Sequence, residues 1–551
     1  MTSCKSIKYR INTDPFGKPC APQSGVFFLW RGEFWRVPAD KMTSAVVEIG
    51  STGIRLLIAQ SSGNRKREKF TILDRSENPV NLGRDVFTTG TISRETLVSS
   101  LRILELYKEQ IASYALTDNQ IIVIATSAVR EAKNRDPYVD RIKVKTGWTV
   151  KVIDGIDENR LMYIAVTETL KEESNSVRQS NSMILDISGG ATEMMVMENG
   201  RILGAHSMRL GTIIIEQKLR SMMGTMEDAR RLIGEFIRNT RKTLSSEMNL
   251  KKIQQFIVLG NDMKKVAVLA GVPVSPFLWE IERSKFDSFV DEIQNFTAEE
   301  CIDKFKISYS EAQTFQISLI AYKLFLSITS VNKVIVAETS TQMGLLLSRN
   351  QDADTEIIDD FNQQICAGAT ALLKKYQGDE HHAEYVRKAS LKIYDALEPE
   401  LGLDRHSKTL LEVSAILHDV GMFIMADNHN IHGKYIVNNS EIFGLNREEK
   451  NLVAMIISFH KGGRQPMDDE EVRLLPRTYR MTINKLSAIL RVADAMDCSH
   501  RQTFKDFRIS LANDTFTMRT KGHHNLSMEK LALEDKGSLF ENVFGYKIVL
   551  L

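Results

Sequence analysis

The sequence predicts an α/β protein made of two similar lobes, followed by a helical region and a small α+β piece at the end. First, a strand–glycine turn–strand unit occurs twice, at residues 45–59 and 183–197, and helix and strand signals alternate after it. Second, residues 365–500 have the hydrophobic spacing of amphipathic helices, and short alternating runs return only beyond residue 503. The repeated unit predicts two lobes that face each other across a cleft.

Length and composition set limits on the class of protein. A chain of 551 residues is long enough for about three to four domains. Hydrophobic residues at 43% and charged residues at 26% exclude a wholly disordered chain. The balance of 72 Lys and Arg against 70 Asp and Glu argues against a dedicated nucleic-acid binder, although such totals can contain local basic patches. We expect lobes at residues 42–170 and 183–348, a helical domain at 361–502 and a terminal piece at 503–551.

The cysteines and the N-terminus favour a cytoplasmic protein. The five cysteines are dispersed, which is typical of reduced thiols. No apolar run reaches the ~18 residues of a membrane helix, and the short run at residues 25–30 is followed by charges, unlike a secretory signal. Residues 1–41 differ in character from the rest of the chain. One hypothesis is that translation starts at Met42 and that residues 1–41 form a non-native extension.

The two glycine turns are candidate phosphate-binding sites. Backbone N–H groups in such turns converge without side-chain obstruction and can bind phosphate oxygens. A carboxylate ends the strand before each turn, and a carboxylate there can hold Mg²⁺ or orient a water molecule. Most single glycine turns only reverse the chain, but two of them, each opening a lobe, favour a site between the lobes. The candidates are Gly50, Ser51, Thr52, Gly189 and Gly190 for phosphate, and Glu48, Asp186 and Glu193 for Mg²⁺.

Four ordered blocks resemble the exopolyphosphatase/guanosine pentaphosphate phosphatase (Ppx/GppA) family. They are ATSAVREAKN at residues 125–134, ENRL at 158–161, DISGGATE at 186–193 and RLG at 209–211. The resemblance spans residues 43–348 and implies duplicated lobes of the actin–hexokinase (RNase H-like) type, with the active site between them. It also implies Mg²⁺-dependent release of terminal phosphate from inorganic polyphosphate or from the 5′ end of guanosine pentaphosphate.

The resemblance also implies roles for individual residues. Glu158 would be the general base that orients or deprotonates the attacking water; without the motif it would be read as a solvated helix-surface glutamate. Arg130 would neutralise phosphate charge, and Arg55 and Arg209 are further phosphate-binding candidates. Glu131 is a catalytic candidate, with a structural ion pair to Arg130 as the alternative.

Several positions depart from the family pattern. Loss of a single hydrogen-bond donor to a developing charge can lower a rate by about 10²–10³-fold. Weak or lost turnover therefore stays open, and a nucleotide or polyphosphate sensor without enzyme activity is an alternative. The departures are Glu48 in place of Asp, Thr52 in place of Asn, Ser188 in place of Gly, Ala191 in place of Ser, and Gly260, Asn261 and Asp262 in place of a Gly-Thr type turn.

A second group of residues, in the helical region, resembles the HD metal-dependent phosphohydrolase domain. That domain uses a His, an adjacent His-Asp pair and a later Asp, and the ligands implied here are His382, His418, Asp419 and Asp494. Such ligands suit a divalent transition metal with an open position for water. Any one of these histidines could instead be an ordinary core residue. Hydrolysis at this centre, with inactive lobes, is an alternative function.

Other residues near this group are weaker candidates. His432 and His460 are candidates for a second metal position or for phosphate binding, and Gly421 in LHDVG indicates a helix-terminating turn. Long members of the phosphatase family carry an HD-like domain here, which often extends a polyphosphate track and builds a dimer. FENVFG at residues 540–545 resembles that family's C-terminal end. We therefore expect a homodimer, with no nucleic-acid duplex and no membrane as partner.

Overall fold

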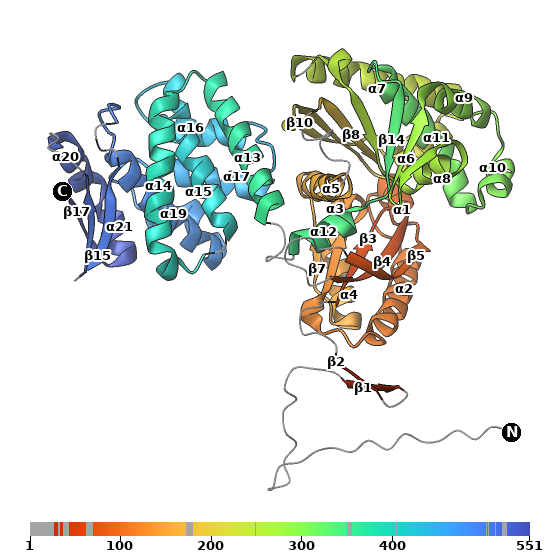
Figure 1. Ribbon diagram of the computed structural model, residues 1–551, viewed down its shortest axis with the longest axis horizontal. Helices are drawn as coiled ribbons and strands as arrows, with labels where there is room; N and C mark the ends of the chain where they lie inside the picture. Colours follow the sequence, from red (N-terminus) through yellow and green to blue (C-terminus); the bar gives the residue numbers. More distant parts are fainter. Residues whose placement is uncertain are drawn as a thin grey trace, which may run out of the picture.

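The computed structural model describes residues 43–61, 70–171, 180–247, 249–349, 355–403, 405–502, 504, 506–512, 514–520 and 526–551 (Figure 1). It also gives the backbone of two short antiparallel strands, β1 (Phe27–Trp30) and β2 (Glu33–Arg36). The rest of the expected N-terminal extension, with Met42, lies outside the described residues. Most of the polar segment between the expected lobes also lies outside them.

The first lobe is built on a five-stranded sheet with the order β5-β4-β3-β6-β7. Its central strands are rich in β-branched residues and are buried on both faces, as is expected of strands covered by helices. Ser93 caps the second helix of this lobe by accepting a hydrogen bond from Thr96 N. The strands are β3 (Thr43–Ile49), β4 (Gly53–Ser61), β5 (Phe70–Pro79), β6 (Ile121–Ala125) and β7 (Val150–Val152). The helices are α1 (Leu82–Thr89), α2 (Arg94–Ala112), α3 (Ser127–Glu131) and α4 (Arg135–Thr146).

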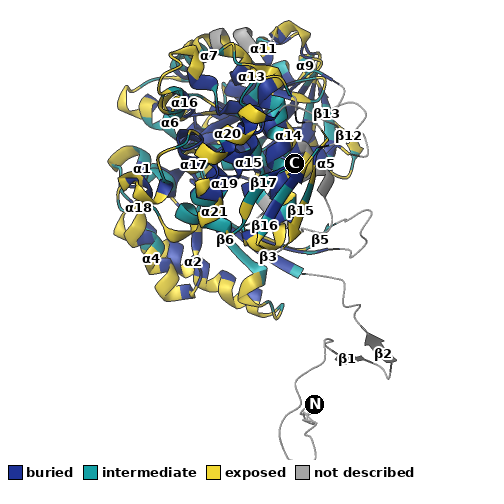
Figure 2. Cartoon of the chain, turned by 90° about the vertical axis from the view of Figure 1, so that its left-hand side faces the viewer, coloured by how far each residue is buried: buried dark blue, intermediate teal, exposed yellow. Residues whose placement is uncertain are grey.

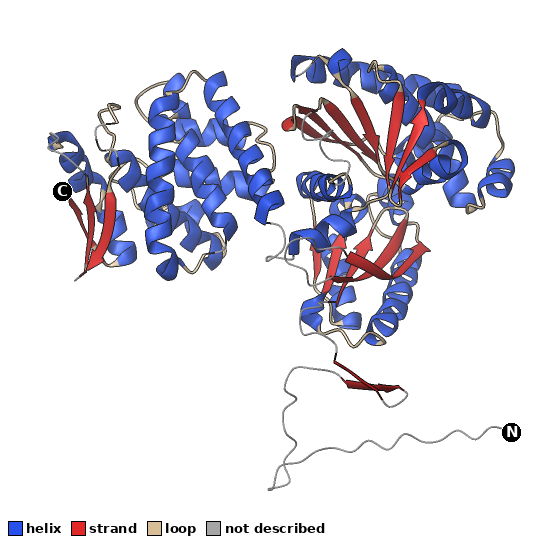
Figure 3. Ribbon diagram, in the orientation of Figure 1, coloured by secondary structure: helices blue, strands red, loops and turns tan. Residues whose placement is uncertain are grey.

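The second lobe contains a seven-stranded sheet with the order β10-β9-β8-β11-β14-β13-β12. Its own helices pack together against one face of the sheet (Figure 3), and helices from the flanking parts of the chain, described below, cover the other. The strands are β8 (Ser182–Ile187), β9 (Thr192–Glu198), β10 (Arg201–Met208), β11 (Gln255–Val258), β12 (Val272–Ser275), β13 (Leu278–Glu282) and β14 (Lys333–Ala337). The helices are α6 (Thr212–Ser221), α7 (Met226–Glu247), α8 (Asn261–Ala270), α9 (Arg283–Ile293), α10 (Ala298–Phe305) and α11 (Tyr309–Ser327).

Both lobes contain the same sheet motif. In each, three consecutive strands form an antiparallel meander, and the first of them pairs in parallel with the next strand of the sheet, β6 in one lobe and β11 in the other. The predicted duplication is therefore present in the strand order. Two helices connect the lobes: α5 (Gly155–Thr169) packs on β9 and β10 of the second lobe, and α12 (Thr341–Arg349) packs on α5 and on β3 of the first.

Between the second lobe and the end of the chain, the residues that the structure describes from 355 to 495 form helices and no strand. Its central helix, α19, is buried over most of its length from Thr482 to Ala495, and α14, α15 and α17 pack around it (Figure 2). The first helix, α13, also contacts α5 and β10, so that the hydrophobic core continues from the second lobe into this region. The helices are α13 (Thr355–Lys375), α14 (Glu380–Leu401), α15 (Arg405–Leu417), α16 (His429–Asn438), α17 (Arg447–Ser458), α18 (Glu470–Arg473) and α19 (Arg477–Ala495).

The end of the chain contains a three-stranded sheet of order β15-β16-β17 and two helices that pack on α19. Among the described residues, no helix combines the length and the apolar character needed to cross a membrane. The elements are β15 (Arg508–Ala512), β16 (Thr515–Arg519), α20 (Ser527–Lys536), α21 (Ser538–Phe544) and β17 (Lys547–Leu550).

Candidate active site and candidate metal centre

The two glycine turns close themselves with backbone hydrogen bonds. Gly50 N donates to Gly53 O at 2.9 Å, and Ser188 N donates to Ala191 O at the same distance. The Ser188 hydroxyl also donates to Ala191 O (3.0 Å) and accepts from Ala191 N (3.2 Å). The serine that departs from the family pattern therefore uses its hydroxyl inside its own turn.

The lobes touch directly at these turns. A Cβ atom added to Gly190 would lie 2.4 Å from Ser127 Oγ and 2.5 Å from Phe87 Cζ, both in the first lobe. A Cβ added to Gly189 would lie 3.0 Å from Thr52 Cγ2. On the first-lobe side, the hydroxyl oxygens of Ser51 and Ser127 are 2.9 Å apart. Glycine is thus needed at residue 190 for the close approach of the lobes, whatever else it binds.

Glu158 is buried at the start of α5. Asp154 caps this helix by accepting hydrogen bonds from Ile156 N and Asp157 N, which places Glu158 in the first turn. Arg130 Nη1 donates to Glu158 Oε1 at 2.6 Å and to Ile153 O at 2.7 Å. Burial raises the pKa of Glu158 to about 7, against the pull of Arg130. A carboxylate with this pKa can take a proton near neutral pH.

Glu193 lies on β9 beside Glu158, and neutral donors hold both of its oxygens. Asn159 Nδ2 donates to Oε2 at 2.8 Å, and Ser207 Oγ donates to Oε1 at 2.7 Å. Burial and the charge of Glu158 hold the pKa of Glu193 well above its usual range. Sequence reasoning gave no role to Asn159 or Ser207; the position of Asn159 next to Glu158 in the ENRL block was the available signal.

Glu48 and Asp186 lie near the ends of β3 and β8, and the charge of one affects the pKa of the other. The pKa of Asp186 is raised to about 6, mainly because the side chain is buried and secondly because of the charge of Glu48. The charge of Arg55 acts against this shift. Arg55 donates to Glu48 Oε1 at 3.1 Å and to Glu77 Oε1 at 2.8 Å. This phosphate-binding candidate is therefore held by two carboxylates of its own lobe.

Two of the predicted residues pair with each other across the lobes. Arg209 Nη2 donates to Glu131 Oε2 at 2.5 Å, whereas Arg130 pairs with Glu158. The alternative of an Arg130–Glu131 ion pair is therefore wrong: α3 directs the two side chains to different partners. The start of α8, which departs from the family pattern, also bridges the lobes, because Asn261 Nδ2 donates to Glu77 Oε2 at 3.0 Å.

The three predicted Mg²⁺ ligands do not form a compact set. Within the part of the chain that the structure describes, every cluster of three potential metal ligands lies in the helical region. Glu48 and Asp186 nevertheless fit a cation, because both are buried or partly buried carboxylates and the charge of Glu48 raises the pKa of Asp186. Mg²⁺ usually binds through one or two carboxylates plus phosphate and water. Glu193, whose oxygens already accept hydrogen bonds, fits this role less well.

In the helical region, the structure brings the four predicted ligands together. Asp379 caps α14 and places His382 in its first turn, while His418 and Asp419 directly follow α15. The Nε2 atoms of His382 and His418 are 3.2 Å apart. Asp494 Oδ1 lies 3.6 Å from the first and 3.9 Å from the second. The four side chains therefore come from the first turn of α14, the two residues after α15, and the last turn of α19.

A second cluster shares Asp419 with the first. Asp419 Oδ1 lies 3.4 Å from the Nε2 atoms of both His429 and His460, which are 3.0 Å from each other. The expectation of His432 at this position is corrected: His432 belongs to none of the clusters found among the described residues. The reason is local. Asn428 is left-handed, with φ of 57°, and starts α16 so that His429 lies beside Asp419.

Gly421 also has a different role from the one expected. Gly421 is not one of the described residues with a positive φ angle, so it does not end α15 as a left-handed cap. A Cβ atom at this position would lie 1.9 Å from His429 O and 2.4 Å from Gly433 N. Gly421 instead lets α16 pack closely enough to bring His429 to Asp419.

The pKa values of several ionisable groups in this centre are strongly shifted. Burial lowers the pKa of His418 to about 4, which keeps its ring neutral. Burial also opposes charge on His382, but hydrogen bonds to Asp494 and Asp497 outweigh this and raise its pKa to about 9. Lys536, at the end of α20, donates to Asp494 Oδ2 at 2.5 Å. Despite burial, Lys536 and His382 hold the pKa of Asp494 well below its usual range.

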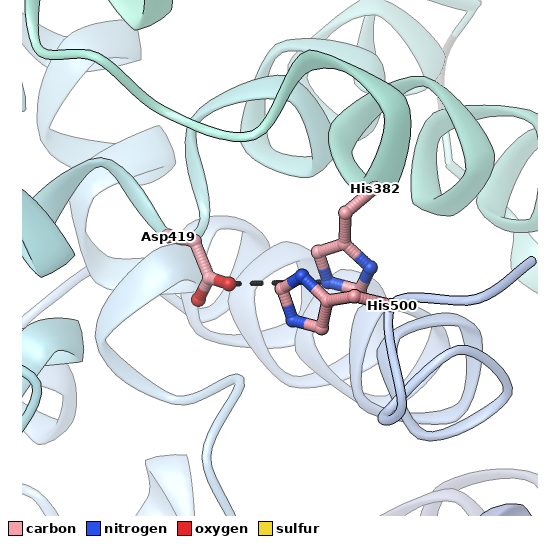
Figure 4. Close-up of side chains that lie close together, drawn as sticks. All are labelled: His382, Asp419 and His500. Atoms are coloured by element: carbon pink, nitrogen blue, oxygen red, sulfur yellow. Dashed lines mark ion pairs between the residues drawn. The ribbon is translucent and has the colours of Figure 1, made fainter.

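His500 lies at the exposed side of the centre. Figure 4 shows it beside His382, with Asp419 across from them. The His500 and His382 rings stack with centroids 3.7 Å apart, and His500 Nδ1 is 3.0 Å from Asp379 Oδ2. His382, Asp419 and His500 form a third possible ligand set. The sequence motifs pointed to neither His429 nor His500, and the density of histidines in this region was the only signal for them.

Comparisons with known proteins found similar proteins over most of the chain. Two relatives are guanosine-5′-triphosphate,3′-diphosphate pyrophosphatases. The one from Aeromonas hydrophila is 20% identical, and the match covers 86% of this chain and 91% of the relative. The one from Aeromonas salmonicida is 22% identical, and the match covers 89% of this chain and 95% of the relative. An exopolyphosphatase from Cytophaga hutchinsonii matches 57% of this chain and 100% of its own, with 20% identity and a TM-score of 0.49. The Aquifex aeolicus member of the Ppx/GppA family gives 21% identity, the same coverage and a TM-score of 0.46.

Family models cover most of the chain. The model of the Ppx/GppA phosphatase family matches residues 57–353, and the model of domain III of Ppx/GppA phosphatases matches residues 367–539. The first match includes both lobes with their shared sheet motif, and the second includes the helices that carry the histidine clusters. The chain therefore belongs to the Ppx/GppA phosphatase family and has that family's actin-like α/β fold.

Proposed function

We propose that the cleft between the lobes hydrolyses the terminal phosphoanhydride bond of inorganic polyphosphate or of guanosine pentaphosphate. The observation that carries this proposal is Glu158, a buried carboxylate at a helix start, paired with Arg130 and with its pKa raised to about 7. A base of that strength suits the activation of water at neutral pH. The names of the relatives, pyrophosphatases of guanosine-5′-triphosphate,3′-diphosphate and an exopolyphosphatase, support the substrate class.

Each predicted residue has a place in this proposal. Glu158 takes the proton of the attacking water, and Asn159 and Ser207 position Glu193 beside it. Glu48 and Asp186 would hold Mg²⁺, which supplies positive charge against the phosphoryl oxygens. Further phosphate contacts are assigned to Gly50, Ser51, Thr52, Arg55, Arg130, Gly189, Gly190 and Arg209, with Glu131 orienting Arg209.

The test is phosphate release in the presence of Mg²⁺ from long polyphosphate, tripolyphosphate and guanosine pentaphosphate in parallel. We expect Glu158→Gln to abolish release from whichever substrate the native protein uses, because the amide cannot take a proton. Glu109→Gln, on the exposed face of α2, is the matched control and should leave release unchanged. Binding without release by a folded native protein would favour a sensor and overturn the proposal.

A second candidate function rests on a separate observation, the convergence of His382, His418, Asp419 and Asp494. We propose that they hold a divalent transition metal and that this centre hydrolyses a phosphoester. His418→Ala combined with Asp419→Ala should remove the metal, as measured by elemental analysis. The same variant should retain polyphosphate hydrolysis in the lobes. Native protein that binds no such metal would exclude this candidate.

We also propose a homodimer, on the ground of the resemblance to long members of the family. Light scattering of the purified protein should then give twice the 62.4 kDa of one chain. A mass of one chain at micromolar concentration would contradict it.

A further inference from the structure

The helical region holds two sets of donor atoms that share one carboxylate. Asp419 Oδ2 lies 3.6 Å from His418 Nε2 and 3.9 Å from His382 Nε2. Its other oxygen, Oδ1, lies 3.4 Å from the Nε2 atoms of His429 and His460. The two oxygens of a single aspartate thus face two different pairs of histidines.

The spacing within each set suits coordination of a metal ion. Tetrahedral ligands at ~2.1 Å from a metal are about 3.4 Å from one another. In the set of Asp419, His429 and His460, the three donor separations are 3.0, 3.4 and 3.4 Å. In the set of His382, His418 and Asp494, they are 3.2, 3.6 and 3.9 Å. Each set therefore surrounds a point at bonding distance from all three of its atoms.

The ring orientations leave the Nε2 atoms available. The Nδ1 atoms of His418, His429 and His460 lie 2.7–2.8 Å from the carbonyl oxygens of Ala415, Ala426 and Ile457. A carbonyl oxygen can only accept, so the proton is assigned to Nδ1 and a neutral ring presents a bare Nε2. Fixing the outer nitrogen of a histidine in this way is how proteins orient metal ligands.

The fourth ring, that of His382, is fixed by a carboxylate. Its Nδ1 lies 2.8 Å from Oδ2 of Asp497, which is fully buried and also accepts from Gln502 N at 2.6 Å. Without a cation, the bare Nε2 atoms of His429 and His460 face each other at 3.0 Å with no donor between them. Two lone pairs at that distance repel, and a shared cation removes the repulsion.

We propose that the helical region binds two divalent transition-metal ions bridged by Asp419, one held with His382, His418 and Asp494 and the other with His429 and His460. Nitrogen and carboxylate donors together suit manganese, iron, cobalt, nickel or zinc rather than Mg²⁺ alone. A bridged pair supplies positive charge on both sides of a phosphoryl group. This inference rests on the second candidate function and extends it from one ion to two.

The test is the metal content per chain of the full-length protein, loaded with Mn²⁺ and freed of excess ion. We expect two ions per chain in the native protein and about one in His429→Ala, because the set of His382, His418 and Asp494 stays complete. His432→Ala is the matched control: this neighbour on α16 lies outside both sets and its loss should leave two ions. Circular dichroism before loading shows whether each variant is folded.

A second readout separates a bridged pair from two independent sites. Electron paramagnetic resonance of the Mn²⁺ protein should show an exchange-coupled pair, and His429→Ala should convert it to the signal of isolated Mn²⁺. One ion per chain in the native protein, unchanged in His429→Ala, would overturn the pair and leave the single-metal candidate. No bound ion would overturn both. Phosphate release by the lobes, tested through Glu158→Gln, is independent of either outcome.

Discussion

The carboxyl of Glu158 lies between one arginine and several other carboxylates. Burial raises its pKa to about 7, the hydrogen bond from Arg130 Nη1 acts against this, and Glu48 and Asp186 add to it. A glutamate in water has a pKa of about 4.3 and is too weak a base to accept a proton from water readily. In the proposed reaction, the local environment of Glu158 would therefore decide whether it can accept a proton from water at neutral pH.

The pH dependence of phosphate release follows from this shift. Glu158 must be ionised to accept a proton, and its folded-state pKa of about 7 lies above the usual value, so release should fall as the pH drops through 7. Below that midpoint we expect about a tenfold loss per pH unit. Arg130→Gln should move the midpoint to higher pH, because it removes the charge that favours the ionised form. Arg135→Gln, whose partner is the exposed Asp136, should not move it. A midpoint near pH 4 in the native protein would contradict the assignment.

At the scale of elements, α5 and α12 cross at very short distance. A Cβ atom on Gly344 of α12 would lie 2.1 Å from Leu161 O of α5. The same helix α12 carries Gln342, whose Nε2 donates to Val46 O and to Arg55 O in the first lobe. Glycine at this crossing therefore sets the position of α5, and with it the position of Glu158.

Gly344→Ala tests this crossing. The added methyl meets backbone, which cannot move aside, so we expect the free energy of unfolding to fall by about 1–3 kcal/mol, as in other overpacked cores. Phosphate release should fall as well, because α5 carries Glu158. Gly234→Ala on α7 is the control: nothing lies within 4 Å of its Cβ position, and alanine should stabilise that helix by up to ~1 kcal/mol. Urea denaturation of both variants measures the difference, and equal behaviour of the two would contradict the proposed role.

Some elements could be predicted from the sequence and others could not, for physical reasons. The strands around Gly50 and Gly189 were predictable because β-branched runs flanked by glycines have few alternatives. The order of His382, His418, Asp419 and Asp494 also indicated a cluster. Sequence periodicity could not choose between His429 and His432, because the start of α16 depends on the left-handed Asn428. The pairing of Arg209 with Glu131 depends on how the lobes approach each other, which no local pattern encodes.

At the scale of the whole molecule, Phe361 of α13 joins the helical region to α5, the helix that packs on the second lobe. Its ring lies 5.8 Å from that of Tyr163 and 5.3 Å from that of Phe443, measured between centroids, and the Arg160 guanidinium is 5.9 Å from it. Gln364 adds hydrogen bonds to Ile202 N and Gly200 O of the second lobe. One hydrophobic core thus runs through both parts.

This continuity predicts how the molecule unfolds. The second lobe and the helical region should melt together in calorimetry, because they share that core. Phe361→Ala should separate them into two transitions, since loss of a buried phenylalanine costs about 3–5 kcal/mol. Phe277→Ala, at a side chain that is 51% exposed, should leave the melting profile unchanged. A single unaltered transition in Phe361→Ala would show that the interface does not couple the two parts.

The direct contact of the lobes at Gly190 has a consequence for how substrate enters. Since no space remains even for a methyl group on the side of Gly190 that faces Ser127 and Phe87, a phosphate could enter between the lobes at this point only after they separate. The observed affinity then equals the intrinsic affinity of the open form multiplied by the fraction of molecules that are open. A substitution that weakens the lobe contact should therefore tighten substrate binding. It should also lower the fraction of molecules in which the closed lobes bring Glu158 and Asp186 together. Affinity and turnover would then change in opposite directions, and the free energy of separating the lobes would set the balance between them.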